Sequence, residues 1–350
     1  MANYYRDSLK DVEAYVPGEQ PRDIEQYIKL NTNENPYPPS PVVEHTVRHF
    51  NAEDLRVYPD PVFSELRRRA ASVFKVPAER IFVANGSDEA LSLIMRIAID
   101  PGDRVAYPYP TYVLYRTLAQ IAGAETVEVD LREDFNLPED FPEKAGKVTF
   151  LARPNSPTAN LFDQQVVEQT LSRSSGLVVV DEAYAAFSGT TMLDHLDRYP
   201  NLVVLRTLSK SYGLAGLRVG FAFAGAEVIE ALYRVKDSYN INAFSQAVAQ
   251  AALSDVGYMK STAAQIIQTR RRALDRLVRQ GFRVYPSAAN FVFAEHERLS
   301  GKQIYEALKD KKILVRYFDQ RRLQAGVRIS IGTEEQMERL GEVLDEILGG

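Results

Sequence analysis

Apolar and polar residues alternate along most of the chain in a pattern that predicts short buried strands separated by amphipathic helices. Seven short apolar runs are expected to form strands: 81–84, 104–107, 126–129, 148–151, 177–180, 202–205 and 219–223. Helices are expected at 88–99, 112–122 and 163–174, and again from residue 227 onward. Strands that are apolar at nearly every position and alternate with helices indicate an α/β fold with a largely parallel sheet covered on both faces.

The two ends of the chain depart from this pattern. Residues 1–41 are rich in Pro, Asn and Tyr, which predicts an extended arm. Near the other end the expected order is a long helix at about 258–280, strand 290–294, helix 302–309, strands 313–316 and 327–331, and a final helix at 334–348. This order is typical of a compact second domain. We therefore expect an arm at 1–41, a large domain at 42–265 and a small domain at 266–350.

Composition narrows the classes of function. The chain has 350 residues, of which 45% are hydrophobic and 25% are charged, as in an ordinary water-soluble protein. Its net charge of −5 argues against a nucleic-acid partner. With no cysteine and four scattered histidines, neither a disulfide nor a metal site is expected. No apolar stretch could span a bilayer and the first residues lack a signal segment, so we expect a cytoplasmic protein without a membrane partner.

Candidate chemistry gathers where apolar strands end, which is where open parallel sheets bind their ligands. Lys210 follows the run 202–205, and Arg218 comes a few residues later. A lysine amine can bond an aldehyde, and an arginine fork suits a phosphate, so the pair points to pyridoxal phosphate. A single lysine after a strand is more often a solvated surface charge, so the neighbouring strand ends decide between the two interpretations.

Asp181 directly follows the apolar run 177–180. A carboxylate there is costly to bury unless it meets a positive partner, and a protonated pyridine nitrogen is such a partner. Asp181 could equally cap a helix or pair with an arginine. Tyr184 lies three residues further on, within reach of an oxygen on the same ring.

Three further strand ends carry polar or aromatic side chains. Ser87 and Asp88 begin a helix after a glycine turn, which makes either a phosphate seat or an ordinary cap. Tyr112 could stack on a pyridine ring or be a half-buried tyrosine at a helix start. Asn155 could donate to a ring oxygen or be a turn asparagine.

In this order along the chain, these side chains resemble those of the fold-type-I pyridoxal-phosphate aminotransferases of class II, and most closely those of the histidinol-phosphate aminotransferases. The resemblance covers essentially the whole length. The motifs that carry it are LNTNENP at 30–36, RVYPDP at 56–61, RTLSK at 206–210, AGLRVG at 215–220 and VRISIGT at 327–333.

The resemblance implies a role for each candidate around the cofactor. It makes Lys210 the residue that bonds the aldehyde and the general base, and Asp181 the partner of the ring nitrogen. The other residues implied to contact the cofactor ring are Tyr184, Asn155 and Tyr112, and those implied to hold its phosphate are Ser87, Asp88, Ser209, Arg218 and Tyr58. Because Tyr58 is supplied by a second subunit, the resemblance implies a homodimer with shared active sites, in which the arm packs on the small domain and on the partner.

The resemblance also implies substrates. An amino group would pass from histidinol phosphate to 2-oxoglutarate, giving imidazole acetol phosphate and glutamate, in histidine biosynthesis. Arg328 would bind the anionic end of each substrate, with Arg316 as a helper or, alternatively, as part of a surface ion pair. Tyr15 and Asn33 of the arm match positions that line the substrate pocket of the family.

Two departures from the family pattern concern the turn at 155–159. Where relatives often read Asn-Asn-Pro-Thr-Gly, this chain reads Asn155-Ser156-Pro157-Thr158-Ala159. The ring-oxygen contact would then come from Asn155, or in part from the hydroxyl of Ser156. Ala159 in place of glycine indicates either that no positive φ is needed there or that the backbone is strained.

Other functions on the same scaffold stay open. An aromatic-amino-acid aminotransferase or a threonine-phosphate decarboxylase would keep the same cofactor residues. A cofactor-binding transcription regulator would need an added DNA-binding module, for which an arm that begins near Met1 leaves no room. A nucleotide-binding dehydrogenase is disfavoured because no strand is followed by G-x-G-x-x-G.

Overall fold

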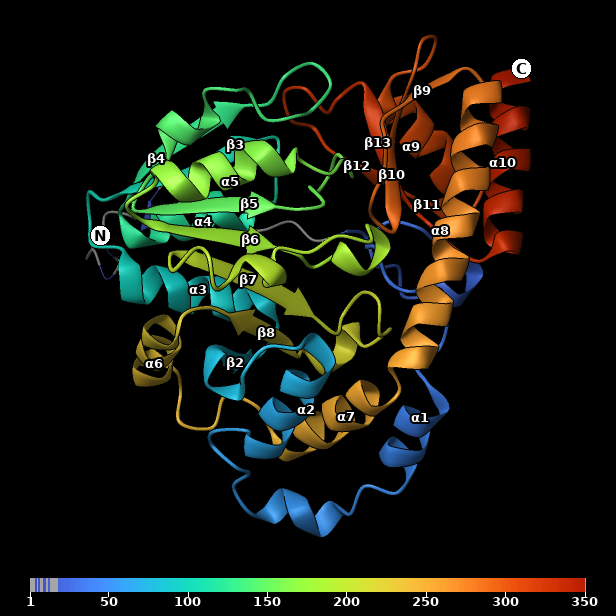
Figure 1. Cartoon of the computed structure of the whole chain (residues 1–350). Helices are drawn as coiled ribbons and strands as arrows, with labels where there is room; N and C mark the ends of the chain where they lie inside the picture. Colours follow the sequence, from blue (N-terminus) through green and yellow to red (C-terminus); the bar gives the residue numbers. More distant parts are fainter. Residues whose placement is uncertain (1–3, 5, 7–8, 11, 13–17, 350) are drawn as a thin grey trace.

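The larger part of the chain is built on a seven-stranded sheet (Figure 1). The computed structural model describes residues 4, 6, 9, 10, 12 and 18–349. The strands are β2 (Ile81–Ala84), β3 (Arg104–Tyr109), β4 (Glu125–Asp130), β5 (Val148–Ala152), β6 (Leu177–Asp181), β7 (Leu202–Thr207) and β8 (Gly220–Phe223). Their order across the sheet is β2-β8-β7-β6-β5-β3-β4, and only β8 runs antiparallel to its neighbours. The predicted, mostly parallel sheet is confirmed.

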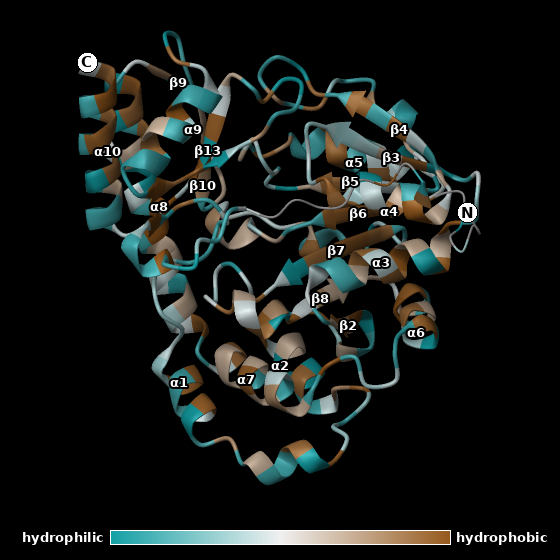
Figure 2. Ribbon diagram, turned by 180° about the vertical axis from the view of Figure 1, so that it is seen from behind, coloured by the Kyte–Doolittle hydropathy of each residue, from teal (hydrophilic) through white to brown (hydrophobic). Residues whose placement is uncertain are grey.

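Helices cover both faces of this sheet, as its buried strands require. On one face, α3 (Ser87–Ala98), α4 (Leu114–Ala122) and α6 (Ala226–Val235) share an apolar core with the strands. On the other face lie α1 (Pro41–Arg48), α2 (Ser64–Phe74), α5 (Gln164–Arg173) and α7 (Ala243–Ser254). The central strands are mainly hydrophobic, whereas the outer helices mix hydrophobic and hydrophilic residues (Figure 2).

A second, smaller sheet follows in the C-terminal part. It joins β9 (Phe282–Val284), β10 (Phe291–His296), β12 (Arg316–Tyr317) and β13 (Gly326–Ser330) in the antiparallel order β12-β13-β10-β9. The helices α8 (Val256–Arg279), α9 (Gly301–Asp310) and α10 (Glu334–Gly349) pack with it around one apolar core. Because α8 runs without a break through position 265, the exact domain division stays a prediction.

The arm takes part in the smaller unit. Its strand β1 (Ile28–Lys29) pairs in parallel with β11 (Ile313–Leu314). This explains one difference from the sequence-based expectation of a single strand at 313–316. The pairing is interrupted at Val315: Ile313 and Leu314 pair with the arm, whereas Arg316 and Tyr317 pair with β13.

Beyond β1 the arm is bonded to both parts of the molecule. Asn33 N–H donates to Ser330 Oγ at 2.9 Å, and Asn290 Nδ2 donates to the Asn33 carbonyl at 3.0 Å, both from the smaller unit. Asn35 Nδ2 donates to the carbonyl of Ser211, on the larger one, at 3.0 Å. The segment 31–35 therefore crosses the molecule close to the residue after Lys210.

Candidate active site

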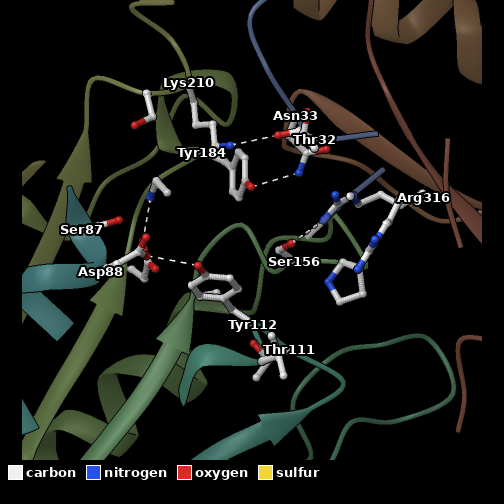
Figure 3. Close-up of a pocket in the computed structure, with 18 of the residues that line it drawn as sticks. Thr32, Asn33, Ser87, Asp88, Thr111, Tyr112, Ser156, Tyr184, Lys210 and Arg316 are labelled. Carbon is white, nitrogen blue, oxygen red and sulfur yellow. Dashed lines mark hydrogen bonds between the residues drawn. The ribbon is translucent and has the colours of Figure 1, made fainter. Parts of the chain in front are cut away.

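A cavity of about 390 Å³ opens where strand ends of the large sheet meet the arm and the small sheet (Figure 3). Among the residues that line it are the predicted Asn33, Ser87, Asp88, Tyr112, Asp181, Tyr184, Ser209, Lys210, Arg218, Arg316 and Arg328. These residues come from widely separated parts of the sequence. The parallel sheet brings most of them together because the carboxyl ends of its strands meet at one edge.

One end of the cavity has the features of a phosphate seat. Gly86 turns the chain from β2 into α3 with a φ of +80°, and a Cβ there would overlap the guanidinium of Arg218. That guanidinium lies 3.1 Å from Asp88 Oδ2 and 3.4 Å from Ser209 Oγ. A helix N-terminus, a hydroxyl and an arginine fork thus converge on one spot, which is the donor set that a phosphate needs.

Asp181 lies at the floor of the cavity with 6% of its surface exposed. Burial raises its pKa to about 6. Oδ1 accepts a hydrogen bond from Ala183 N–H at 3.0 Å, and Oδ2 accepts one from the Tyr115 hydroxyl at 3.1 Å. Within the described part of the chain, no lysine, arginine or histidine forms an ion pair with this carboxyl group. A protonated ring nitrogen would supply the missing positive charge, so the site fits the pyridine ring of pyridoxal phosphate.

Lys210 approaches from the loop after β7. Its Nζ donates to the Thr32 carbonyl of the arm at 3.2 Å and lies 5.7 Å from the centre of the Tyr184 ring. The Tyr184 hydroxyl in turn accepts a hydrogen bond from Asn33 Nδ2 at 3.0 Å. The amine, the phenol and the arm therefore meet at one place in the cavity (Figure 3).

Two arginines form the wall that the small sheet contributes. Arg316 and Arg328 are paired in register on β12 and β13, and both line the cavity. Arg328 donates to the Asn31 carbonyl at 2.8 Å and to Ser156 Oγ at 3.3 Å. Each guanidinium also lies over the ring of Phe318. Two guanidinium groups on one wall make a strong binding site for an anionic group.

The turn at 155–159 carries Asn155 and Ser156, the two residues between which the sequence left the ring-oxygen contact. Asn155 is fully buried, and its Nδ2 donates to the Pro110 carbonyl and to Thr158 Oγ1, while its Oδ1 accepts from Thr111. These bonds use both hydrogens of the amide. Ser156, the alternative left open by the sequence, lines the cavity instead. The side chain of Asn155 is therefore held within the turn, and of the two residues Ser156 is the one that lines the cavity. The contact with the cofactor ring stays a prediction.

The same turn answers the question about Ala159. Its φ is +67°, a left-handed conformation that a glycine would adopt without a Cβ penalty. The alanine is fully buried in a small cluster with Ala289 and Phe291. The strained alternative is therefore the one observed.

Tyr58 is a predicted cofactor residue that is not brought to the cavity of a single chain. Tyr58 is 79% exposed, and its ring stacks on that of Tyr239 with centroids 4.3 Å apart. It is not among the described residues that line the cavity. Tyr15 lies outside the described residues.

Sequence reasoning missed several residues of the site. Arg116 and Gln120 of α4, and Gln320 from the loop before β13, also line the cavity. Arg116 and Gln120 follow Tyr112 at four-residue steps, which puts all three side chains on one side of a helical stretch. That spacing was the signal available in the sequence, whereas nothing local marked Gln320.

Comparison with known proteins identifies the class. Residues 25–344 match the family model of aminotransferase class I and II, so the chain belongs to this family. The histidinol-phosphate aminotransferase 1 of Trichormus variabilis is 42% identical over 349 residues, which cover 99% of this chain and 100% of the relative. The histidinol-phosphate aminotransferase of Geotalea uraniireducens is 45% identical over 343 residues, 98% of this chain and 99% of the relative.

Solved structures agree on the fold. The crystal structure of histidinol-phosphate aminotransferase from Sinorhizobium meliloti in complex with pyridoxal-5'-phosphate superposes with a TM-score of 0.88 at 23% identity, covering 100% of this chain and 98% of that one. This superposition confirms the predicted fold. The family match and the full-length relatives confirm the predicted enzyme class, a pyridoxal-phosphate-dependent aminotransferase. Within the described ranges, none of the helices combines the length and apolar character needed to cross a bilayer.

Proposed function

We propose that this protein transfers the amino group of histidinol phosphate to 2-oxoglutarate in the cytoplasm, giving imidazole acetol phosphate and glutamate, as a step of histidine biosynthesis. The observation that carries the proposal is the pair Arg316 and Arg328 on one wall of the cavity that also holds Lys210. Full-length relatives at 42% and 45% identity that are histidinol-phosphate aminotransferases support it.

Each residue in the part of the cavity that would hold the cofactor has a separate role. Lys210 would bond the cofactor, Asp181 would face its ring nitrogen, and Arg218 with the start of α3 would hold its phosphate. When bound, pyridoxal phosphate supplies an electron-poor ring that stabilises negative charge on the substrate carbon bearing the amino group. The Lys210 amine, once displaced by the amino substrate, acts as the general base that removes the proton from that carbon. The Tyr184 hydroxyl and the arm close the space around that amine.

The arginine wall accounts for two unlike substrates. Histidinol phosphate carries a phosphate and no carboxylate next to its amino group, whereas glutamate carries two carboxylates. A guanidinium fork makes two-point contacts with either kind of anion. Arg328 and Arg316 would therefore hold the phosphate of one substrate and a carboxylate of the other in turn, with the amino carbon directed toward Lys210.

We further propose that the protein acts as a homodimer with shared active sites. Tyr58 is highly exposed and lies in a stretch with other exposed apolar side chains, namely Leu55, Val57 and Val62. Exposed apolar residues gathered in one surface segment are typical of a protein–protein interface. In such a dimer the phenol of Tyr58 would reach the phosphate seat of the other subunit.

An absorbance spectrum tests the substrate. Purified protein loaded with pyridoxal phosphate is mixed in separate samples with histidinol phosphate, phenylalanine and O-phosphothreonine. We expect histidinol phosphate to convert the band of the lysine-bound cofactor into that of the aminated cofactor, and 2-oxoglutarate to restore it. A preferential response to phenylalanine, or release of carbon dioxide from O-phosphothreonine, would overturn the proposal in favour of the corresponding enzyme.

A pair of variants links that response to the arginine wall. Arg328→Gln should keep the cofactor band but need about 10- to 100-fold more histidinol phosphate for conversion, because a charge-assisted contact is lost. Arg283→Gln is the matched control, since Arg283 lies on β9 of the same sheet with an exposed side chain away from the cavity. Equal responses of the two variants would count against the role of Arg328.

A further inference from the structure

Tyr115 lies directly beneath the cavity and touches two of the residues that face the cofactor. It is fully buried and is not among the described residues that line the cavity. Its hydroxyl donates to Asp181 Oδ2 at 3.1 Å. Its ring meets the Tyr112 ring edge-on, with centroids 5.7 Å apart at 86°. One side chain thus supports both the carboxylate below the ring nitrogen and the aromatic residue that would stack on the ring.

The hydrogen bond favours the charged form of Asp181. Burial, the largest influence, raises the pKa of this carboxyl to about 6, and the donors Ala183 N–H and Tyr115 O–H act in the opposite direction. Among the described residues, Tyr115 is the one side chain that donates to Asp181. Removing its hydroxyl would make the carboxylate more basic, so the proton shared with a pyridine nitrogen would shift toward the carboxylate.

The hydroxyl of Tyr115 stays protonated and can therefore act as a hydrogen-bond donor. Burial, and then the charge of Asp181, raise the pKa of Tyr115 well above its ordinary value, so its proton stays in place over the working range of pH. The ring is held by stacking on Phe150 of β5, with centroids 4.8 Å apart and planes 10° from parallel. Tyr112 lies two residues before α4 and Tyr115 lies in its first turn, so a displacement of either ring would displace the other.

We propose that Tyr115 is a positioning residue for amino transfer: its hydroxyl keeps Asp181 oriented and charged toward the cofactor nitrogen, and its ring supports Tyr112. This inference rests on the proposed role of Asp181 within the proposed function. Tyr115 itself contacts neither cofactor nor substrate.

The test uses Tyr115→Phe, which keeps the ring and removes the hydroxyl. Three quantities are measured: the dissociation constant of pyridoxal phosphate from the cofactor-free protein, the ¹⁵N chemical shift of the pyridine nitrogen in labelled bound cofactor, and kcat. We expect cofactor binding about tenfold weaker and kcat about tenfold lower, as for loss of one hydrogen bond to a charged group. The ¹⁵N signal should move toward the value of an unprotonated pyridine.

Tyr233→Phe is the matched control. Tyr233 packs against the same apolar core, and its buried hydroxyl has no hydrogen-bond partner among the described residues. Its removal should leave all three quantities unchanged. If the dissociation constant and kcat of Tyr115→Phe also stay within about twofold of wild type and its ¹⁵N signal does not move, the proposal is wrong, because the expected loss is that of a hydrogen bond to a charged group.

A double-mutant cycle separates positioning from a general packing effect. In an Asp181→Ala background, Tyr115→Phe should no longer weaken cofactor binding, whereas an equal loss in both backgrounds would overturn the proposal.

Should Tyr115→Phe fail to fold, 3-fluorotyrosine at position 115 keeps the contact and strengthens the donor. The ¹⁵N signal should then move toward the value of a protonated pyridine, and an unmoved signal would refute the proposal. If the proposed substrate is wrong, wild-type protein will bind the cofactor but will not react with histidinol phosphate. The measurements of cofactor affinity and of the ¹⁵N chemical shift would still test the role of Tyr115.

Discussion

At the scale of single residues, the site depends on groups whose ionisation is set by their surroundings. Asp181 is a carboxyl group at the end of an apolar strand, buried among neighbours that include the acidic Asp88 and Glu182. The sequence indicated that such a group needs a positive partner. Its side-chain donor Tyr115 could not be predicted, because Tyr115 is 66 residues away along the chain.

The pKa of Asp181 leads to a prediction about the cofactor-free protein. In the folded state this pKa rises from 3.8 to about 6. The folded protein then binds the proton more tightly than the unfolded chain, so this group contributes stability below pH 3.8 that is lost as the pH rises through about 6. A pKa difference of about 2 corresponds to about 3 kcal/mol.

Urea unfolding of cofactor-free wild type and of Asp181→Asn at a series of pH values measures this effect, since the asparagine cannot titrate. The free energy of unfolding of wild type relative to the variant should fall by up to about 3 kcal/mol between pH 4 and 7. Bound pyridoxal phosphate should reduce that fall in wild type by supplying the positive partner. A difference between the two proteins that does not depend on pH would contradict the assignment.

The turn at 155–159 shows why residue roles are harder to predict than residue types. The sequence placed Asn155 and Ser156 side by side at the end of β5, and both carry polar side chains. Which of them faces the cavity depends on the local turn, where Asn155 bonds to Pro110, Thr111 and Thr158. Contacts to residues from another segment, such as Pro110 and Thr111, do not follow from the local pattern.

At the scale of elements, the predicted phosphate seat is built on the strand–turn–helix unit β2–Gly86–α3. The start of α3 was predicted to within one residue from the Ser-Asp pair and the preceding glycine. The close approach of Arg218 to Gly86 was not, since the two are brought together by the antiparallel pairing of β2 with β8. In that pairing Gly220, two residues after Arg218, lies opposite Ala84.

Gly86→Ala tests that unit. The new Cβ would clash with the Arg218 guanidinium, so we expect the affinity for pyridoxal phosphate to fall by at least about tenfold. Because residue 86 has a φ of +80°, the free energy of unfolding should also fall by about 1 kcal/mol. Gly102→Ala is the control, because Gly102 also has a positive φ, +90°, but has nothing within 4 Å of the added Cβ. It should show the same stability loss with unchanged affinity.

Repeating the measurement with pyridoxal, which lacks the phosphate, locates the effect. Gly86→Ala should bind pyridoxal about as well as wild type does. An equal loss for both ligands would mean that the substitution disturbs more than the phosphate seat.

At the scale of the whole molecule, the cavity exists because three parts of the chain meet. The large sheet contributes Lys210 and Asp181, the small sheet contributes Arg316 and Arg328, and the arm passes between them with Thr32 and Asn33. The surface that carries Tyr58 is separate from this cavity in a single chain. A second copy of the chain is therefore what our proposal requires to complete the site.

Mixed dimers test that requirement. Lys210→Ala should bind cofactor without turnover, because Asp181 and Arg218 remain, and Tyr58→Ala should lose activity when cofactor is limiting. In a heterodimer of the two variants, one active site would contain both the native Lys210 and the native Tyr58, and the other site would contain neither. Co-expression in equal amounts should therefore restore about a quarter of wild-type activity at limiting cofactor. Activity no higher than the sum of the separate variants would contradict a shared site.

The sequence by itself determined the α/β class and the order of the strands and helices along the chain, and it predicted the cofactor roles of Lys210, Asp181 and Arg218. These features depend on the local periodicity of apolar residues and on which residue follows each strand. Both properties can be read from short contiguous segments of the sequence. Only the tertiary structure decided that β8 runs antiparallel, that β11 pairs with the arm, that Ser156 rather than Asn155 faces the cavity and that Tyr115 supports Asp181. Each of these results from a contact between distant segments, which arises only when the sheets close around their cores.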